Sequence, residues 1–362
     1  MSSQTSARNL PLATAGTATW RSRALAILLM AVIGSIFWVD SRYPALMKRY
    51  RAGTEVKAAG KLSFGVVYQV DRTMTLATRV WRTTANWLEA NRVGMTFSFL
   101  FGPAALTLLA MLPRRRTNSR YLNTLFGAAA GVPMAVCSNC IAPIARGLYL
   151  SGMSRESVLA AMFASPALNV VVLAMTFTLF PAKLAVLKLS TVLLLILVFA
   201  PLVATRSQDN DTVYTCPIEI PAAETWTQAI VSVATSYAKG FWQVFRVAFP
   251  LMILAAALGA LLIEVVPPQA LAGPATLPGI VAVSLISAFL PVPMAFDVAI
   301  AFIAMTHGAP LPYVAAMLCT LGILSVYSAS VVGKTISWRV AGAAYATVAG
   351  LGIAAGLVAR AF

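Results

Sequence analysis

The chain has 362 residues, of which 59% are apolar and 10% charged, and its mean hydropathy is +0.82. A soluble domain carries roughly 25% charged residues, so this composition excludes an ordinary soluble protein and predicts an all-α polytopic membrane protein. Lys and Arg outnumber Asp and Glu by 27 to 11, which gives a net charge of +16. In a membrane protein such a surplus faces anionic lipid from loops and helix ends, so we expect the lipid bilayer, and no nucleic acid, as partner.

The N-terminal region is predicted to anchor the chain. Arg21 and Arg23 precede the first apolar run, at about 24–39, and no small-residue cleavage site follows it. We therefore expect a retained transmembrane helix rather than a signal peptide. A basic stretch, 41–92, comes next and contains the amphipathic segment 70–90, whose pattern predicts a helix lying flat at the membrane interface.

Apolar segments long enough to cross a bilayer recur along the rest of the chain, since a spanning helix needs roughly 20 residues. About nine transmembrane helices are predicted, at 24–39, 93–112, 121–150, 155–180, 182–204, 244–266, 277–306, 311–333 and 336–359. A polar loop, 206–223, and a second amphipathic segment, 224–242, separate the fifth span from the sixth.

The order of these segments repeats. Gly152 and Gly308 are 156 residues apart and lie in similar sequences between consecutive spans. Each half would hold one amphipathic segment and four spans, and an even number of crossings predicts two parallel four-helix repeats plus an N-terminal helix. The predicted domains are 1–62, with the N-terminal tail, first transmembrane helix and basic loop; 63–205, repeat 1; 206–223, the polar loop; and 224–362, repeat 2.

Sidedness follows from the basic residues in short loops. The triplet at 114–116 places residues 113–120 in the cytoplasm, the N-terminus inside and the loop 206–223 on the opposite side. We expect a multi-pass protein of a bacterial-type inner membrane.

Two of the predicted spans contain helix breakers near mid-membrane. The span 121–150 holds Gly131, Pro133 and Pro143, and the span 277–306 holds Pro291 and Pro293 at the matching depth. Transporters use broken helices to aim half-helix N-termini at a central site, so we expect broken helices at the repeat interface. Ordinary proline kinks are the other account.

Only four cysteines occur, which are too few for a disulfide scaffold. Cys216 and Cys319 are isolated, whereas Cys137 and Cys140 form a CxxC pair inside an apolar span. Residues three apart share a helix face, so two soft thiolates could hold one thiophilic atom, with Met162 as a further thioether candidate. Buried packing residues and a redox dithiol remain alternatives for the pair.

The stretch "CSNCIAP" and the downstream "FASPALN" resemble a predicted-permease family that includes organoarsenical and metal efflux permeases. That family carries a Cys-Ser-Cys motif on a broken helix, a later Pro and a Ser-Pro-x-x-Asn motif. The positions that match are Cys137, Ser138, Pro143, Ser165, Pro166 and Asn169. The second cysteine of the family falls at Asn139, and this chain has it at Cys140 instead. We expect these eight residues to bind substrate, although Ser165 and Asn169, which share a helix face, could instead pin one helix to another.

Charged residues at membrane depth are functional candidates by default. Asp297 lies four residues after Pro293 and is predicted either to carry a coupling proton or to pair with Arg146. Lys188 and Glu264 lie nearer helix ends, where we expect their side chains to reach toward the membrane surface.

These observations predict a permease, not an enzyme, that moves a thiophilic metal or metalloid species such as a trivalent arsenical or a soft metal ion. No GxxxxGK[ST] motif occurs, so we expect efflux driven by an ion gradient or by the gradient of the substrate itself. We expect no cofactor. The expected partner is a small inorganic or organometalloid substrate, and a bound soft metal ion would count as substrate. The chain could also form homo-oligomers. A membrane-embedded dithiol that passes electrons is the alternative function, and a scaffold subunit with packing cysteines is a third.

Overall fold

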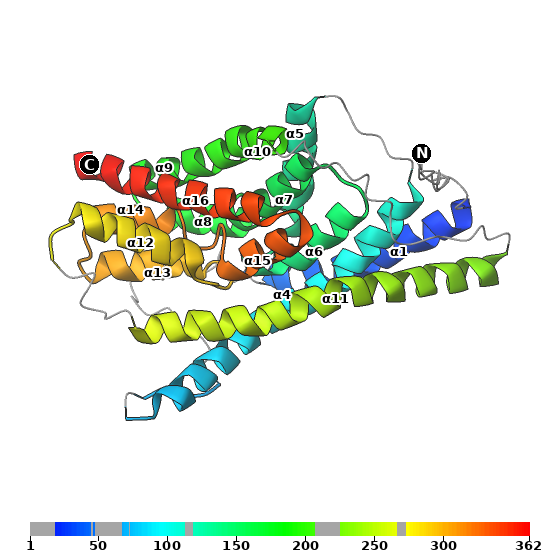
Figure 1. Ribbon diagram of the computed structural model, residues 1–362, viewed down its shortest axis with the longest axis horizontal. Coiled ribbons are helices and arrows are strands. Elements are labelled where there is room, and N and C mark those ends of the chain that lie inside the picture. Colours follow the sequence, from blue (N-terminus) through cyan, green and yellow to red (C-terminus); the bar gives the residue numbers. More distant parts are fainter. Residues whose placement is uncertain are drawn as a thin grey trace, which may run out of the picture.

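The computed structural model describes residues 19–44, 46–47, 67–71, 73–112, 119–206, 225–265 and 273–362. These residues are almost entirely helical and include no strand, which confirms the all-α class (Figure 1). The Arg triplet at 114–116, Cys216 and nearly all of the loop 206–223 lie outside the described residues.

The helices of the first half, in chain order, are α1 (Trp20–Phe37), η1 (Trp38–Arg42), α4 (Leu76–Met111), α5 (Arg120–Gly131), η2 (Val132–Met134), α6 (Ser138–Leu150), α7 (Arg155–Ala167), α8 (Val170–Leu179), α9 (Ala182–Leu194), η3 (Leu195–Phe199) and α10 (Ala200–Arg206). Those of the second half are α11 (Trp226–Val265), α12 (Leu277–Phe289), α13 (Phe296–Thr306), α14 (Leu311–Leu318), α15 (Val326–Thr335), α16 (Trp338–Val358) and η6 (Ala359–Ala361).

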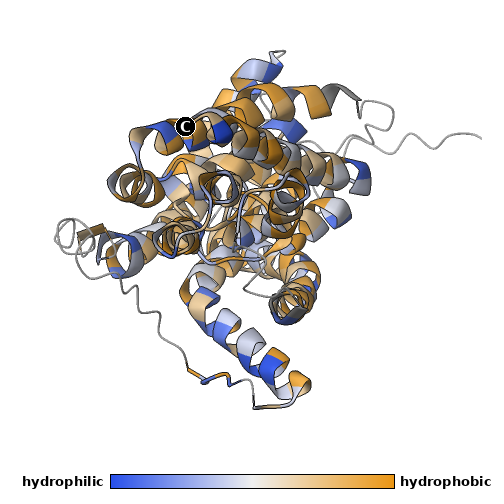
Figure 2. Cartoon of the chain, turned by 90° about the vertical axis from the view of Figure 1, so that its left-hand side faces the viewer, coloured by the Kyte–Doolittle hydropathy of each residue, from blue (hydrophilic) through white to orange (hydrophobic). Residues whose placement is uncertain are grey.

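Several helices are suited to cross a bilayer. Among the described residues, five are long and apolar enough, and a sixth span results if the pair α7–α8, bent by 46°, is counted as one. Hydrophobic residues dominate the bundle, whereas hydrophilic ones gather at helix ends and on the projecting first part of α4 (Figure 2). The chain is therefore membrane-embedded, but nine spans are not confirmed.

The two predicted interfacial helices are not separate elements. Their residues 76–90 and 226–242 run without a break into the spans that follow them, as parts of α4 with 36 residues and α11 with 40. At 1.5 Å per residue these helices are about 54 and 60 Å long, and both exceed the thickness of a hydrocarbon core. The prediction was wrong because an amphipathic pattern does not reveal whether the next span continues the same helix.

The two long helices run antiparallel. Arg79 near the start of α4 pairs with Glu264 near the end of α11, at 3.0 Å. Further along α4, the Tyr237 hydroxyl of α11 donates to the Leu100 carbonyl at 3.2 Å. As residue numbers rise on α4 they fall on α11, so the predicted parallel arrangement of the two halves is wrong.

Residues 121–150, predicted as one span, instead form a helical hairpin. A Cβ on Gly127 would collide with the backbone of Ser157, and one on Gly131 with that of Ala161, so α5 and α7 lie side by side and run the same way. The chain must therefore reverse its direction between α5 and α7. The reversing helix is α6, which packs against α7 and is joined to it by a short connection. We call α5–α6 hairpin 1.

Residues 277–306 form an equivalent hairpin 2, α12–α13. The contacts that fix its direction are those of Gly352 with Ser284 and Thr320, and of Gly356 with Ile280 and Pro312. Both α12 and α14 therefore run opposite to α16 and parallel to each other, and α13 returns the chain between them. Each turn contains an alanine in the left-handed region, Ala135 with φ 47° and Ala295 with φ 67°. Such conformations cost roughly 1–3 kcal/mol and recur at functional sites.

Each half thus has a long helix, a hairpin, a pair of short helices separated by a break, and a further long apolar segment, α9–α10 or α16. The starts of corresponding helices are offset by 156 residues: α7 and α14 begin at 155 and 311, α8 and α15 at 170 and 326, and α9 and α16 at 182 and 338. Because a hairpin begins and ends at the same end of the bundle, neither hairpin counts as a crossing.

This topology changes the expected sidedness. Hairpin 1 starts at the end of the bundle where α4 finishes, and α10 returns to pack against α5 and α7 (Figure 1). The end of α4, the start of α5 and the end of α10 therefore lie at one end of the bundle. This arrangement favours one compartment for both connections, 113–118 and 207–224, whereas the sequence prediction counts hairpin 1 as a crossing and places them in opposite compartments.

We predict that topology reporters fused within 113–118 and within 207–224 give the same signal. A reporter after Gly308, in the connection between α13 and α14, should give the opposite signal and serves as the control. Opposite signals from the first two fusions would contradict the hairpin.

Candidate functional site

The breaks in four helices bring four helix N-termini into the interior of the bundle. Three of them are capped by side chains: the Cys137 Sγ accepts from the Cys140 amide of α6, Asn169 Oδ1 from the Val172 amide of α8, and Ser325 Oγ from the Ser328 amide of α15. The fourth, α13, begins with Asp297 in its first turn. Helix N-termini carry partial positive charge, so this interior attracts electron-rich groups.

Asn139 joins three of these segments. Its amide nitrogen donates to the Val292 carbonyl of the hairpin 2 turn at 3.0 Å, and its amide oxygen accepts from the Ser325 hydroxyl at 2.7 Å. The side chain is fully buried. Predicted as a substrate ligand, Asn139 occupies the junction of hairpin 1, hairpin 2 and the break between α14 and α15.

The predicted Ser-Pro-x-x-Asn residues hold the break between α7 and α8. Ser165 Oγ accepts from the Val136 amide of hairpin 1 at 3.2 Å. Asn169 caps α8 and also donates to the carbonyls of Ser165 and Pro166, both at 2.9 Å. These contacts satisfy backbone groups that the break frees in an apolar interior.

Cys137 and Cys140 form the centre of the candidate site. Their sulfurs are 2.7 Å apart, and both residues are almost completely buried. The Asn91 Oδ1 of α4 lies 3.6 Å from the Cys137 sulfur. Met162 belongs to the same hydrophobic cluster as both cysteines. The structure therefore brings the predicted cysteines together at the start of α6.

Helix α4 packs closely on α6 next to the cysteine pair. A Cβ on Gly94 would come within 2.6 Å of the Cys140 sulfur, and one on Gly102 within 3.0 Å of the Pro143 carbonyl oxygen. Only glycine leaves room for the sulfur at this point of α4.

Two site residues were not predicted from the sequence. Arg42, at the end of η1, places its Nη2 atom within 4 Å of the same Gly94 position that the Cys140 sulfur approaches. Tyr327, in the first turn of α15, is fully buried and belongs to the same hydrophobic cluster as both cysteines. The sequence assigned Arg42 to a basic loop because the apolar run ends before it; the helix continues past that run.

Asp297 has a partner that was not predicted. The Lys188 ammonium of α9 lies 2.7 Å from Asp297 Oδ2, and both side chains are buried. The expectation that Lys188 reaches the membrane surface is wrong, and so is the alternative pairing of Asp297 with Arg146. The Arg146 guanidinium instead donates to the Gln243 carbonyl at 3.1 Å and to Thr335 Oγ1 at 3.0 Å.

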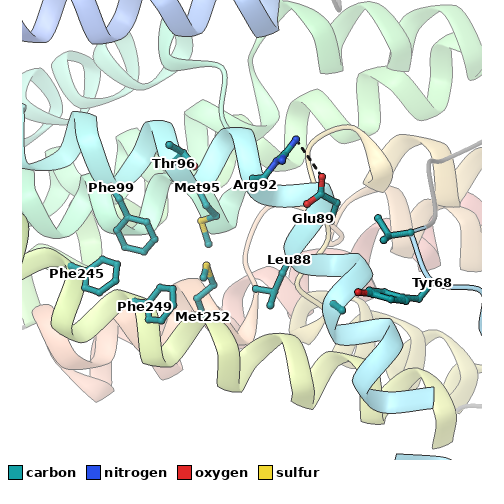
Figure 3. Close-up of a pocket in the computed structure, with 12 residues that line it drawn as sticks. Tyr68, Leu88, Glu89, Arg92, Met95, Thr96, Phe99, Phe245, Phe249 and Met252 are labelled. Atoms are coloured by element: carbon teal, nitrogen blue, oxygen red, sulfur yellow. Dashed lines mark ion pairs between the residues drawn. The ribbon is translucent and has the colours of Figure 1, made fainter. Parts of the chain in front are cut away.

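A separate cavity of about 710 Å³ lies between α4 and α11, lined by methionine and phenylalanine side chains (Figure 3). Met95, Phe99 and Met252 line it, and the Glu89–Arg92 ion pair lies at its edge. It contains none of the site residues predicted from the sequence. Across the described ranges, no group of three or more His, Cys, Asp or Glu side chains could hold a metal ion. A metal ion at the cysteine pair would therefore have two sulfur ligands and no such further side chain.

Comparison with known proteins identifies the family. A family model described as predicted permease, ArsP_1, matches residues 93–361, well over half of the chain. No curated protein and no solved structure shows a significant match. The matched region contains every site residue predicted from the sequence, whereas Arg42 precedes it.

We predict that Asp297→Leu destabilises the protein by about 3–5 kcal/mol, because it leaves the buried Lys188 charge uncompensated. The double variant Lys188→Met/Asp297→Leu should regain most of this loss. Thermal melting in detergent measures both effects.

The matched control is Glu89→Gln, which breaks the exposed ion pair with Arg92. Exposed pairs contribute about 0–1 kcal/mol, so this variant should melt close to wild type. A single Asp297→Leu variant as stable as the control would contradict the buried pair.

Proposed function

The chain belongs to the predicted-permease family, and we propose that it exports a thiophilic metal or metalloid species across a bacterial-type inner membrane. The substrate class is a trivalent arsenical or a soft metal ion. The observation that carries the proposal is the pair of buried sulfurs 2.7 Å apart at the N-terminus of α6, where the breaks of both halves meet. Family membership itself makes the chain a membrane transporter.

Thiol chemistry supports this substrate class. Sulfur ligands favour soft centres over hard cations such as Mg²⁺ or Ca²⁺. On a trivalent arsenical the two thiols replace two hydroxyl groups, and each hydroxyl leaves as water with the proton of one thiol. The species is then held by two As–S bonds, and water reverses the exchange when the site opens.

The arrangement of the halves supports transport by alternating access. The shared offset of 156 residues and the antiparallel course of α4 and α11 are what an inverted duplication would produce. Inverted repeats place the substrate site at their interface, where Asn139 links the two hairpins. We propose that one half moves against the other around the cysteine pair, with the N-terminus in the cytoplasm.

Asp297, together with its partner Lys188, is proposed to couple transport to proton movement. A buried ion pair can exchange a proton only when its partners separate, so coupling would require the α9–α13 contact to open during transport. The double variant Lys188→Gln/Asp297→Asn removes both charges and keeps similar volumes.

We predict that this double variant inserts normally but loses transport driven by a proton gradient, by at least about tenfold. Transport in inverted membrane vesicles with an imposed pH gradient measures this, and counterflow without a gradient is the control. Wild-type acceleration by the gradient in the variant would show that the pair is structural.

A second function is favoured by one observation. Cys137 occupies the N-cap of α6, and its sulfur accepts the Cys140 amide at 3.1 Å. A CxxC pair at a helix N-terminus is the arrangement of dithiol redox proteins, in which the helix end favours the thiolate. A membrane-embedded dithiol that passes electrons would use the same geometry.

The test separates the two functions through single substitutions. We predict that Cys137→Ser removes resistance of expressing cells to trivalent arsenicals or soft metals, because serine replaces a soft ligand by a hard, weak one. Cys140→Ser should weaken resistance, and less severely. Cys319→Ser, which changes another buried cysteine, is the matched control and should behave as wild type.

Redox function predicts a different pattern. Both single variants at 137 and 140 would then be equally inactive, and thiol alkylation would show the wild-type pair alternating between dithiol and disulfide. If both variants protect cells as wild type does, the cysteines only pack and neither function holds.

A further inference from the structure

Two buried hydroxyl groups beside the cysteine pair lack a hydrogen-bond partner. Within the part of the chain that the structure describes, no partner reaches Ser138 Oγ or the Tyr327 hydroxyl, and the two residues are at most 1% exposed. Ser138 directly follows Cys137, and Tyr327 belongs to the same buried cluster as both cysteines. Buried polar groups are normally satisfied, so these two are available to a ligand.

Arg42 adds a buried positive charge to the same place. Its guanidinium stacks on the Phe37 ring at 4.4 Å, and Nη1 donates to Ser41 Oγ at 3.3 Å. Its Nε atom has no hydrogen-bond partner and no carboxylate pairs with it among the described residues. A buried cation without a counter-ion is costly, so a negatively charged group is expected to approach it.

The helix ends act in the same direction. The N-termini of α6 and α15 carry Ser138 and Tyr327, and their partial positive charges add to that of Arg42. A bare soft cation held by the two sulfurs would be repelled by these positive charges. A ligand that carries its own negative oxygen would instead be attracted to them.

We infer that the site selects a thiophilic species that carries an anionic oxygen group, with Cys137 and Cys140 holding the soft centre and Arg42, Tyr327 and Ser138 holding the oxygens. The inference rests on the proposed function and narrows its substrate class to acids or oxyanions. It also makes η1, which precedes the family match, part of the site. Arg42 is then a specificity-determining residue.

Two probes that differ by one charge test this. Phenylarsine oxide and its 4-carboxy derivative share the arsenic centre, and only the second carries a carboxylate. Binding to the purified full chain is measured by competition against a thiol-reactive fluorescent arsenical, and transport in inverted vesicles. Wild type should prefer the carboxylated probe by at least about tenfold, as expected for a buried charge pair.

The variants assign the preference to residues. Arg42→Gln should abolish it by weakening binding of the carboxylated probe far more than binding of the neutral probe, and Arg42→Lys should keep most of it because the charge remains. Tyr327→Phe, which removes only the hydroxyl, should reduce it. Arg92→Gln, at an exposed ion pair on α4, is the matched control and should leave the preference unchanged.

The outcomes separate this inference from the proposed function. If wild type binds both probes equally and Arg42→Gln changes nothing, while Cys137→Ser abolishes binding of both, the anion selectivity is wrong and the thiophilic site stands. If Cys137→Ser binds both probes as wild type does, the proposed function itself fails. Arg42→Lys distinguishes loss of charge from misfolding, because it preserves the cation in the fold.

Discussion

The side-chain amide of Asn139 is the contact on which the central architecture depends. A helix that breaks inside a membrane frees backbone groups that lipid cannot satisfy, so each break needs polar side chains nearby. Asn139 meets this need for three segments at once, with one hydrogen bond to the hairpin 2 turn and one to the cap of α15. Ser165 and Asn169 do the same for the break in the first half. Because these bonds hold the helix starts together, the sulfurs of α6 keep a defined place among them.

Local signals predicted much of this site. Proline, glycine and polar capping residues act within a few positions, so the breaks near Pro133 and Pro293 and the importance of Asn169 were visible in the sequence. The cysteine pair was visible for the same reason, since its members are one helical turn apart. The all-α class and the membrane setting followed from composition alone, and the family match agrees with the resemblance that the motif indicated.

The direction of the helices and the pairing of residues distant in the chain could not be predicted in the same way. Hydropathy measures the length of an apolar segment and not whether the chain reverses inside it. It therefore predicts a transmembrane span for each hairpin and a parallel arrangement of the two halves. Lys188 and Asp297 are 109 residues apart, and nothing near either residue indicates the other. Arg42 reaches the site only because η1 extends the first helix beyond its apolar run and packs it on α4. Each error arose where tertiary packing, rather than local sequence, decides the outcome.

The number of sulfur ligands bears on how the site would work. A structural metal site usually has four protein ligands and holds its ion tightly. This centre offers two sulfurs, and no three or more His, Cys, Asp or Glu side chains in the described chain are grouped so that they could hold a metal ion. A species held by two sulfurs keeps other positions open to water or to ligands of its own. Oxygen ligands of the species would then face Tyr327, Ser138 and Arg42, which belong to α15, α6 and η1. Recognition would then depend on η1 and α15, which are far apart in the chain, while the bonds to sulfur would be few enough to exchange, which suits a carrier better than a storage site.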